Sequence, residues 1–177
     1  DARLVSDPEE AALATGVVLP GVGAFGPCME ALRSSGLDSV AQGAVERGVP
    51  FLGICVGMQM LYEGSEEAPG VPGLGVFPGV VSLLPAGVKR PQMQWNRLIP
   101  GGSGCPLLDG LGEDPWMYFV HSYVPPDSPD VVARCDYGGA LTAMVQRDRV
   151  WATQFHPEKS GQVGLALLAN FVALACP

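Results

Sequence analysis

The chain has 177 residues, of which 47% are hydrophobic and 16% charged. This is enough for one domain with a substantial buried core, and too apolar for intrinsic disorder. A formal net charge of −8 argues against nucleic acid as a partner, because phosphate binding needs a basic surface. No apolar run reaches membrane-spanning length. Five cysteines without a CxxC pair favour reduced thiols in a cytoplasmic protein over disulfides or a zinc site.

The first half of the chain alternates strand and helix patterns. Asp7 precedes a proline and two acids, a typical helix start. The expected elements are a short strand at 3–5, a helix from Pro8, a strand at 17–19, a glycine-rich loop at 20–26, helices at about 28–33 and 37–47, and a buried strand at 49–52. Such alternation indicates βα units and a parallel sheet with both faces covered.

The second half reads as short strands separated by Gly, Pro and Asp turns. They are expected at 80–84, 93–98, 116–120, 131–135, 142–146 and 150–155, with a brief helix near 105–111, a loop at 68–79 and an apolar helix at 161–175. We therefore predict a single α/β domain over residues 1–177. Its sheet is expected to be mostly parallel and flanked by helices, with an added antiparallel portion in the second half.

A cysteine stands between the strand at 49–52 and a helix pattern at 56–62, in the segment Gly53-Ile54-Cys55-Val56-Gly57. The flanking glycines suit a turn so tight that neighbouring β-carbons would crowd it. The helix N-terminus favours a thiolate. This pattern predicts a nucleophile elbow, and we interpret the other cysteines as structural thiols: Cys28, Cys105, Cys135 and Cys176.

The chain has two histidines, which narrows the search for a catalytic base. His156 follows a strand and precedes a proline, so a loop can aim its ring at the cysteine, and Glu158 can orient it. The alternatives are a structural histidine and an exposed acid. His121 ends an apolar strand and is interpreted as structural. Together these residues predict a cysteine-dependent acyl-transfer enzyme with Cys55, His156 and Glu158 as its triad.

Two further features lie close to the elbow in the expected fold. Backbone N–H groups of Gly21, Val22 and Gly23, together with that of Val56, can form an oxyanion hole, although a plain strand-to-helix turn is the alternative. The segment does not match a phosphate-binding loop. Gln59 lies one helical turn after Cys55 on the same face and can reach a substrate, although exposed glutamines on helices are common.

Six segments of the chain resemble a known family. The segments 53–59 and 154–160, which carry the cysteine and the histidine, resemble class I (triad-type) glutamine amidotransferases. The segments 19–25, 95–96, 119–123 and 158–161 are similar to those of the glutaminase subunit of imidazole glycerol phosphate synthase. The first two specify the superfamily only, whereas the other four together specify the subunit, and the resemblance covers essentially the whole chain.

The resemblance implies a glutaminase of histidine biosynthesis that needs no metal or organic cofactor. Cys55 would attack the glutamine carboxamide, and ammonia would pass to a barrel-shaped cyclase subunit that makes imidazole glycerol phosphate and an aminoimidazole carboxamide ribonucleotide. By the same resemblance, glutamine is bound by Gln59, Ser122 and Tyr123, and the cyclase is faced by Trp95, Asn96 and Lys159.

Two departures from the family accompany this resemblance. The family usually begins with a strand–loop–helix unit that this chain lacks, and we expect a truncated record whose neighbouring strands lose a pairing partner. Gln92 and Gln94 stand where the family generally has histidine and glycine. A side chain at a φ > 0 glycine position costs about 1 kcal/mol or more, so we expect altered coupling of this loop to the cyclase.

Other readings of the sequence differ in function. The glutaminase subunit of anthranilate or aminodeoxychorismate synthase is a near alternative, but those proteins usually carry histidine at the position of Met58. A non-catalytic module that binds the cyclase is an alternative from another class. The missing first strand favours the module, and the intact triad argues against it.

Overall fold

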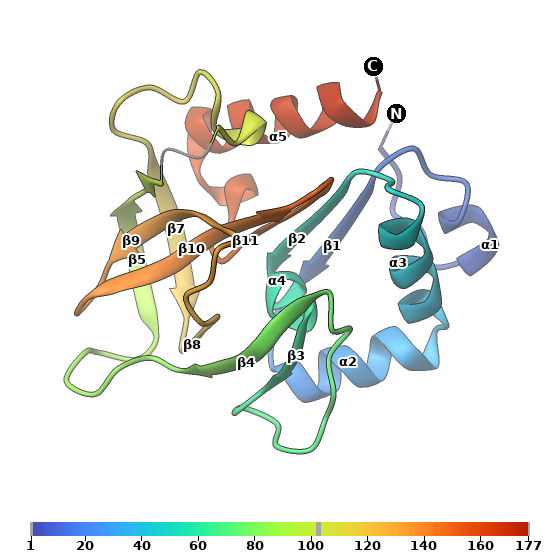
Figure 1. The fold of residues 1–177 in the computed structure, drawn as a ribbon, viewed down its shortest axis with the longest axis horizontal. Coiled ribbons are helices and arrows are strands. Elements are labelled where there is room, and N and C mark those ends of the chain that lie inside the picture. The colour runs from blue at the N-terminus through green and yellow to red at the C-terminus, as the bar shows by residue number, and fades with distance from the viewer. Residues whose placement is uncertain (1, 102–103, 177) are drawn as a thin grey trace.

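The computed structural model describes residues 2–101 and 104–176, and a six-stranded mixed sheet lies at its centre (Figure 1). The strand order is β1-β2-β11-β10-β9-β6. These strands are β1 (Val17–Gly21), β2 (Phe51–Cys55), β11 (Val150–Thr153), β10 (Ala140–Arg147), β9 (Val131–Asp136) and β6 (Ile99–Pro100). β2 pairs in parallel with both β1 and β11, whereas the other three pairings are antiparallel. The sheet is therefore mixed, and the antiparallel portion expected in the second half supplies three of its five pairings.

Two smaller sheets complete the strand content of the described residues. One joins β3 (Tyr62–Ser65), β4 (Phe77–Leu83) and β8 (Tyr123–Val124). The other is a two-stranded ribbon of β5 (Gln92–Arg97) and β7 (Trp116–His121). The ribbon matters for the site described below, because β7 hydrogen-bonds to the segment that carries His156.

Helices cover the central sheet on both of its faces. In Figure 1, α5 runs along one side of the sheet, whereas α1, α2 and α3 gather beside β1. The helical segments are α1 (Pro8–Ala11), α2 (Phe25–Ser34), α3 (Leu37–Glu46), α4 (Val56–Met60), α5 (Gly161–Ala175) and the 3₁₀ turns η1 (Pro106–Leu108) and η2 (Pro157–Lys159). Asp7 caps α1 by accepting from the Glu9 N–H at 2.9 Å, which confirms the predicted helix start.

Alternate residues of the central strands enter two separate cores. Leu52 and Trp151 face the core that includes α5, where the Trp151 and Phe171 rings meet edge to face at 6.3 Å. Phe51 and Ala152 face the other core, together with α3 and β4. Because the central strands are buried on both faces, they read as continuous apolar runs in the sequence.

Most expected elements are present, and the exceptions have local causes. The helix expected at 161–175 is confirmed with the same bounds. The strand expected at 3–5 was wrong, since that segment is irregular. The helix expected at 56–62 ends at Met60, because Tyr62 begins β3 and its ring packs on Phe77 at 5.5 Å. The short strands β3, β6 and β8 were missed because their pattern is too brief to detect.

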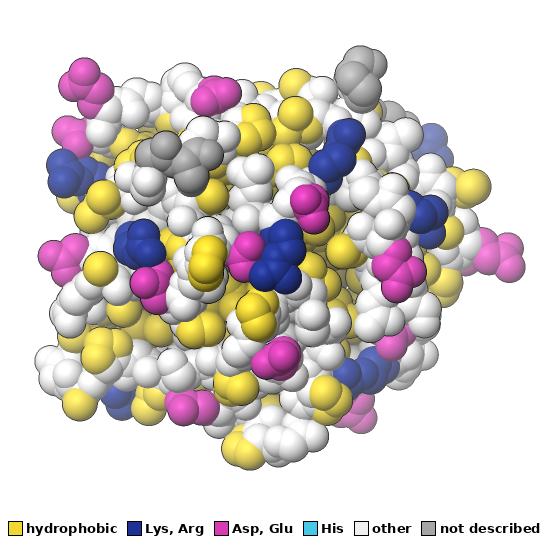
Figure 2. Space-filling view, viewed as in Figure 1, with side chains coloured by type: hydrophobic (Ala, Val, Ile, Leu, Met, Phe, Trp, Pro, Cys, Tyr) yellow, Lys and Arg dark blue, Asp and Glu magenta, His cyan; other side chains and the backbone are white. Residues whose placement is uncertain are grey.

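The surface of the described residues carries charges of both signs. Lys and Arg side chains are interspersed with Asp and Glu over the face shown in Figure 2. Within these residues, helices are too short or too polar to reach across a lipid bilayer.

Candidate active site

Cys55 lies at the junction of β2 and α4 in a strained backbone conformation. Its φ of 55° and ψ of −111° fall outside the regions that a non-glycine residue ordinarily occupies. The side chain is 5% exposed. The turn places Cys55 at the first position before α4, where the Val56 N–H lowers the pKa of its thiol. The geometry agrees with the predicted nucleophile elbow.

The glycines around the elbow are required by close backbone contacts. A β-carbon on Gly57 would lie 1.9 Å from the carbonyl oxygen of Leu19, and one on Gly53 would lie 2.9 Å from the carbonyl oxygen of Gly57. Gly21, which pairs with Cys55 across β1 and β2, would place a β-carbon 2.7 Å from the Gly57 nitrogen. The glycine flanks therefore have the steric role that the sequence predicted.

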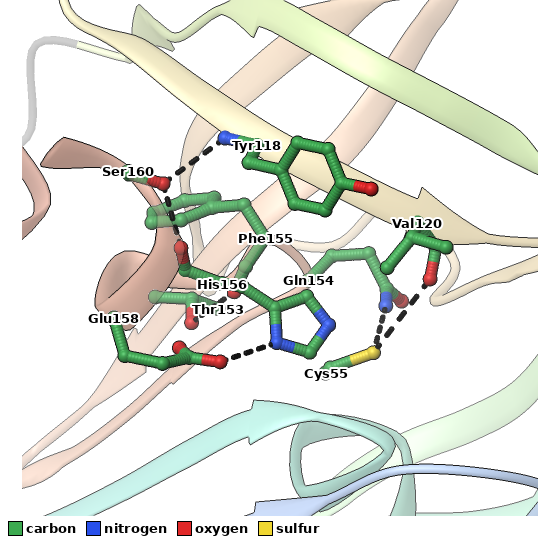
Figure 3. A network of polar contacts seen from close by, with 9 residues as sticks. All are labelled: Cys55, Tyr118, Val120, Thr153, Gln154, Phe155, His156, Glu158 and Ser160. Atoms are coloured by element: carbon green, nitrogen blue, oxygen red, sulfur yellow. Dashed lines mark hydrogen bonds and ion pairs between the residues drawn. The ribbon is translucent and has the colours of Figure 1, made fainter.

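The imidazole of His156 lies between Glu158 and the sulfur of Cys55 (Figure 3). Its Nδ1 is 2.7 Å from Oε1 of Glu158. Because a carboxylate accepts, Nδ1 carries a proton, and Nε2 of a neutral ring then has a free lone pair. Figure 3 shows Nε2 on the side of the ring that faces Cys55. This arrangement lets His156 take the thiol proton.

The main chain of His156 is held by strand β7. Its N–H donates to the carbonyl of Tyr118 at 3.0 Å. The hydroxyl of Ser160 donates to the His156 carbonyl at 2.6 Å and accepts from the Tyr118 N–H at 3.0 Å. Gly164 allows α5 to approach, since a β-carbon there would lie 1.9 Å from the Pro157 oxygen. The candidate base is thus fixed by two elements besides its own turn.

The electrostatic environment keeps Cys55 protonated at rest. Burial raises the pKa of its thiol to about 11, and the nearby Glu158 carboxylate adds to this rise. The Val56 N–H and the Lys159 ammonium lower the pKa, but with smaller effect. A thiol in this state needs a base to become nucleophilic, and His156 is in place to act as one.

A cavity of about 350 Å³ opens over the cysteine and collects most of the predicted site residues. Its lining includes the candidate nucleophile and base, three of the four predicted oxyanion-hole residues, the three predicted glutamine-pocket residues and one residue assigned to the partner face: Val22, Gly23, Cys55, Val56, Gln59, Ser122, Tyr123, His156 and Lys159. A larger cavity of about 540 Å³ lies over β3 and β4. None of the predicted site residues lines that second cavity, so the first is the candidate active site.

Comparison with known proteins agrees with this geometry. Residues 4–175 match the family "Glutamine amidotransferase class-I". The chain belongs to this family. Curated relatives named imidazole glycerol phosphate synthase subunit HisH include those of Methanothermobacter thermautotrophicus (50% identity, 98% of this chain and 86% of the relative) and Deinococcus radiodurans (50%, 96% and 80%). A solved structure titled as a glutamine amidotransferase aligns with a TM-score of 0.75 at 25% identity, covering 98% of this chain and 86% of the other.

Four predicted site residues of this amidotransferase lie outside the cavity lining. Gly21 and Glu158 each stand close in sequence to a lining residue, whereas Trp95 and Asn96 belong to the β5–β7 ribbon. Trp95, on β5, is 49% exposed and meets the Tyr118 ring edge to face at 6.2 Å. The Asn96 amide donates to the carbonyl of Asp136 at 2.9 Å and so ties the β5–β7 ribbon to β9. Lys159, assigned with them to the partner face, lines the cavity instead.

The two glutamines that depart from the family pattern lie in a regular strand. Gln94 pairs with Phe119 across the β5–β7 ribbon, and its φ is not positive. The expected strain from a side chain at a positive-φ position is therefore absent at Gln94. Gln92 is fully buried beside its cross-strand partner His121.

His121 is part of the cavity wall of this amidotransferase and carries no charge at neutral pH. Its Nδ1 lies 2.8 Å from the carbonyl oxygen of Tyr123, which can only accept, so Nδ1 holds the ring proton. Burial lowers the pKa of His121 to about 4, although the Tyr123 carbonyl opposes this effect. The interpretation of His121 as structural agrees with this hydrogen bond.

Two residues near Cys55 had no assigned role in the sequence reading. Glu67 lines the cavity, and its Oε2 accepts from the Phe25 N–H at 2.7 Å, at the start of α2. Gln154 is fully buried, with its Nε2 3.8 Å from Sγ of Cys55. Glu67 lies in a turn next to another acidic residue, and no motif in the sequence marks it as part of a binding site. Gln154 stands next to the histidine motif, but there it reads as a strand residue.

Proposed function

We propose that this amidotransferase is the glutaminase subunit of an imidazole glycerol phosphate synthase. The observation that carries the chemistry is the His156 ring, held by Glu158 with its second nitrogen facing the buried sulfur of Cys55. The relatives that span nearly all of the chain at about half identity support the choice of synthase. In this proposal residues 1–177 form one amidotransferase domain.

The reaction follows from the positions of the three side chains. His156 Nε2 accepts the Cys55 thiol proton as the sulfur attacks the carboxamide carbon of glutamine. The tetrahedral intermediate then expels its nitrogen, which leaves as ammonia after His156 returns the proton. Water, activated by the same imidazole, hydrolyses the glutamyl thioester, which releases glutamate and restores the thiol. Glu158 keeps the proton on Nδ1 throughout.

The oxyanion of the intermediate needs backbone donors beside the sulfur. The Val56 N–H acts on the Cys55 sulfur and lowers its pKa, and Val22 and Gly23 line the same cavity. Val22 is 76% exposed and Gly23 has a φ of 99°, so side-chain packing does little to hold the peptides of this segment. We assign the oxyanion hole to Gly21, Val22, Gly23 and Val56.

Glutamine has charged groups at the end opposite its carboxamide, and the cavity offers partners for them. We assign the glutamine pocket to Gln59, Ser122 and Tyr123, which line it together with Glu67. The Glu67 carboxylate supplies negative charge for the α-ammonium group of the substrate. Polar side chains that orient a small ligand in this way are typical of ligand pockets.

The ammonia released at Cys55 would pass to a cyclase subunit in a heterodimer. That subunit would use it to form imidazole glycerol phosphate and the aminoimidazole carboxamide ribonucleotide. Exposed Trp95 and its neighbour Asn96, with Lys159 at the cavity, form the face proposed for this partner. A cytoplasmic location belongs to the same proposal, supported by five cysteines that are all free thiols.

Glutamate release from glutamine, measured with and without a cyclase subunit and its nucleotide substrate, tests this proposal. We expect slow release alone and strong stimulation by the partner, because partner binding would fix the oxyanion segment. Stimulated release should vanish in Cys55→Ala. Binding of the cyclase without any glutamate release would favour the non-catalytic module, and rapid partner-free turnover would contradict conditional activation.

A further inference from the structure

A chain of side-chain amides connects the Tyr123 carbonyl to the candidate nucleophile. Nε2 of Gln59 donates to the carbonyl oxygen of Tyr123 at 3.2 Å and to Oε1 of Gln154 at 3.0 Å. Nε2 of Gln154 in turn lies 3.8 Å from Sγ of Cys55, and Figure 3 shows this contact beside the one from the sulfur to Val120. The two glutamines come from α4 and from the residue that follows β11.

The orientation of both amides follows from one backbone atom. The Tyr123 oxygen can only accept, so the end of Gln59 that faces it must be the NH₂ group. That NH₂ group faces Gln154, so Gln154 presents its oxygen there and its own NH₂ group to the sulfur. Rotating either amide by half a turn would bring two oxygens or two NH₂ groups together. The hydrogen bonds therefore direct an N–H of Gln154 toward Cys55.

Burial and backbone hydrogen bonding restrict the position of Gln154. Its side chain is fully buried, and its backbone N–H donates to the Ala143 carbonyl of β10 at 2.9 Å. Gln59 is 3% exposed. A buried amide is costly unless its groups are hydrogen-bonded. A pair of amides held in a chain that ends on a cysteine therefore indicates a role at that sulfur.

We propose that Gln154 is a positioning residue for Cys55, which its amide hydrogen-bonds in an orientation set by Tyr123 through Gln59, so that the thiolate is favoured when His156 removes the proton. This proposal deepens the proposed glutaminase function. An N–H donor to a charged acceptor is stronger than one to a neutral acceptor. The 3.8 Å contact should therefore shorten on ionisation, as catalytic contacts seen at rest commonly do.

The same hydrogen bonds determine which atom of the Gln59 amide is available to the substrate. Both hydrogens of its amide are used by Tyr123 and Gln154. Its Oε1 is then the atom of this side chain that can accept a hydrogen bond from a ligand in the cavity. A substrate that donates to this oxygen would affect the amide that orients Gln154. Substrate binding and activation of the sulfur would then depend on the same hydrogen bonds.

The pH dependence of Cys55 alkylation by iodoacetamide tests this role without requiring turnover. The rate is followed for the peptide that contains Cys55, which separates it from the other cysteines. Gln154→Met keeps the length of the side chain but removes the donor. We expect the midpoint of the alkylation profile to rise by about one pH unit, which makes alkylation about tenfold slower at a pH below the midpoint. Gln154→Glu should shift it further, because a carboxylate opposes the thiolate.

The matched control is Gln146→Met, the same exchange on strand β10 outside the cavity lining. It should leave the profile unchanged. Gln59→Leu removes the amide that orients Gln154 and should shift the midpoint in the same direction, and adding Gln154→Met to it should shift it little further. Thermal melts confirm folding, and Gln59→Leu serves if Gln154→Met does not fold.

An unshifted profile in folded Gln154→Met, or fully additive shifts in the double variant, would overturn the proposal. Its failure can be told apart from failure of the glutaminase assignment. Wild-type protein that releases glutamate while Gln154→Met keeps the wild-type alkylation profile rejects only the role of Gln154. A shifted profile without glutamate release in the presence of a cyclase supports that role and rejects the glutaminase assignment.

Discussion

The thiol of Cys28, in α2, donates a hydrogen bond to the backbone carbonyl of Val22 at 3.3 Å. Because the peptide that follows Val22 is planar and trans, its N–H points away from α2 when its carbonyl points toward Cys28. One side chain of the first helix turn after the glycine-rich segment thus holds the orientation of a peptide in the proposed oxyanion hole.

Removing this thiol should loosen the segment. In Cys28→Ala the Val22 carbonyl loses a weak hydrogen bond, worth about 0.5–1 kcal/mol. Partner-free glutamate release should then rise about two- to fivefold, because reorienting the peptide costs less. Cys28→Ser keeps a donor and should stay near the wild-type rate. An unchanged or lower rate in the alanine variant would show that the bond does not restrain the hole.

Gly57→Ala should be severely destabilising. The new β-carbon would overlap the Leu19 carbonyl oxygen at 1.9 Å. Leu19 cannot retreat without breaking the pairing of β1 with β2, and Gly57 cannot retreat without moving α4. We expect a loss of about 3 kcal/mol or more in the free energy of unfolding, measured by urea denaturation. Gly64→Ala is the control, since its nearest contact would be 3.5 Å. A loss of similar size in both variants would refute the steric argument.

Glu67→Gln should weaken glutamine binding more than it slows the chemistry. The substitution removes the charge that faces the α-ammonium group but keeps an oxygen for the Phe25 N–H. With a cyclase present, KM for glutamine should rise about tenfold while kcat changes little. Glu66→Gln is the matched control, because the Glu66 carboxylate accepts from Leu83 N–H outside the cavity lining. An equal fall of kcat and kcat/KM would assign Glu67 to the transition state instead.

His121 should make the protein sensitive to acid. Its pKa is lowered in the folded state to about 4 from an ordinary value of 6.5, so between these values the unfolded chain binds the proton more tightly. Stability is therefore full above about pH 6.5 and falls as pH drops toward 4, by about 2 kcal/mol between pH 7 and pH 5. Urea denaturation at several pH values measures this slope. His121→Gln, which does not titrate, should flatten it, and an identical slope in that variant would assign the acid sensitivity to other groups.

Local steric and periodic rules explain which parts could be predicted from the sequence. The Cys55 elbow depends on glycines within two residues of the cysteine, and the α5 helix depends on a continuous apolar run, so both are visible in the sequence. The segment at 3–5 has strand-forming residues, but a strand also needs a neighbour to pair with, and local sequence does not specify one. Tyr62 was likewise expected in a helix, but it lies in a strand and packs on Phe77, which is fifteen positions away in the sequence.

The residues missed at the site share one property, which is that their roles depend on distant partners. Glu67 bonds to the N–H of Phe25, 42 positions earlier, and Gln154 contacts Cys55, 99 positions earlier. The proposed triad could be predicted because a cysteine elbow and a histidine–proline–glutamate turn each have a recognisable local pattern. A single buried amide has no such pattern, and only the fold reveals that its N–H points to the sulfur.

The hydrogen bonds of Ser160 have a mechanical consequence. The ring of Tyr118 meets that of exposed Trp95 edge to face, and the Tyr118 backbone hydrogen-bonds to both the Ser160 hydroxyl and the N–H of His156. Tyr118 of β7 therefore contacts the Trp95 ring through its side chain and the His156 segment through its backbone. Pressure applied to the ribbon from outside would be transmitted to the angle at which His156 meets the sulfur, so a docking protein could tune proton transfer without entering the cavity.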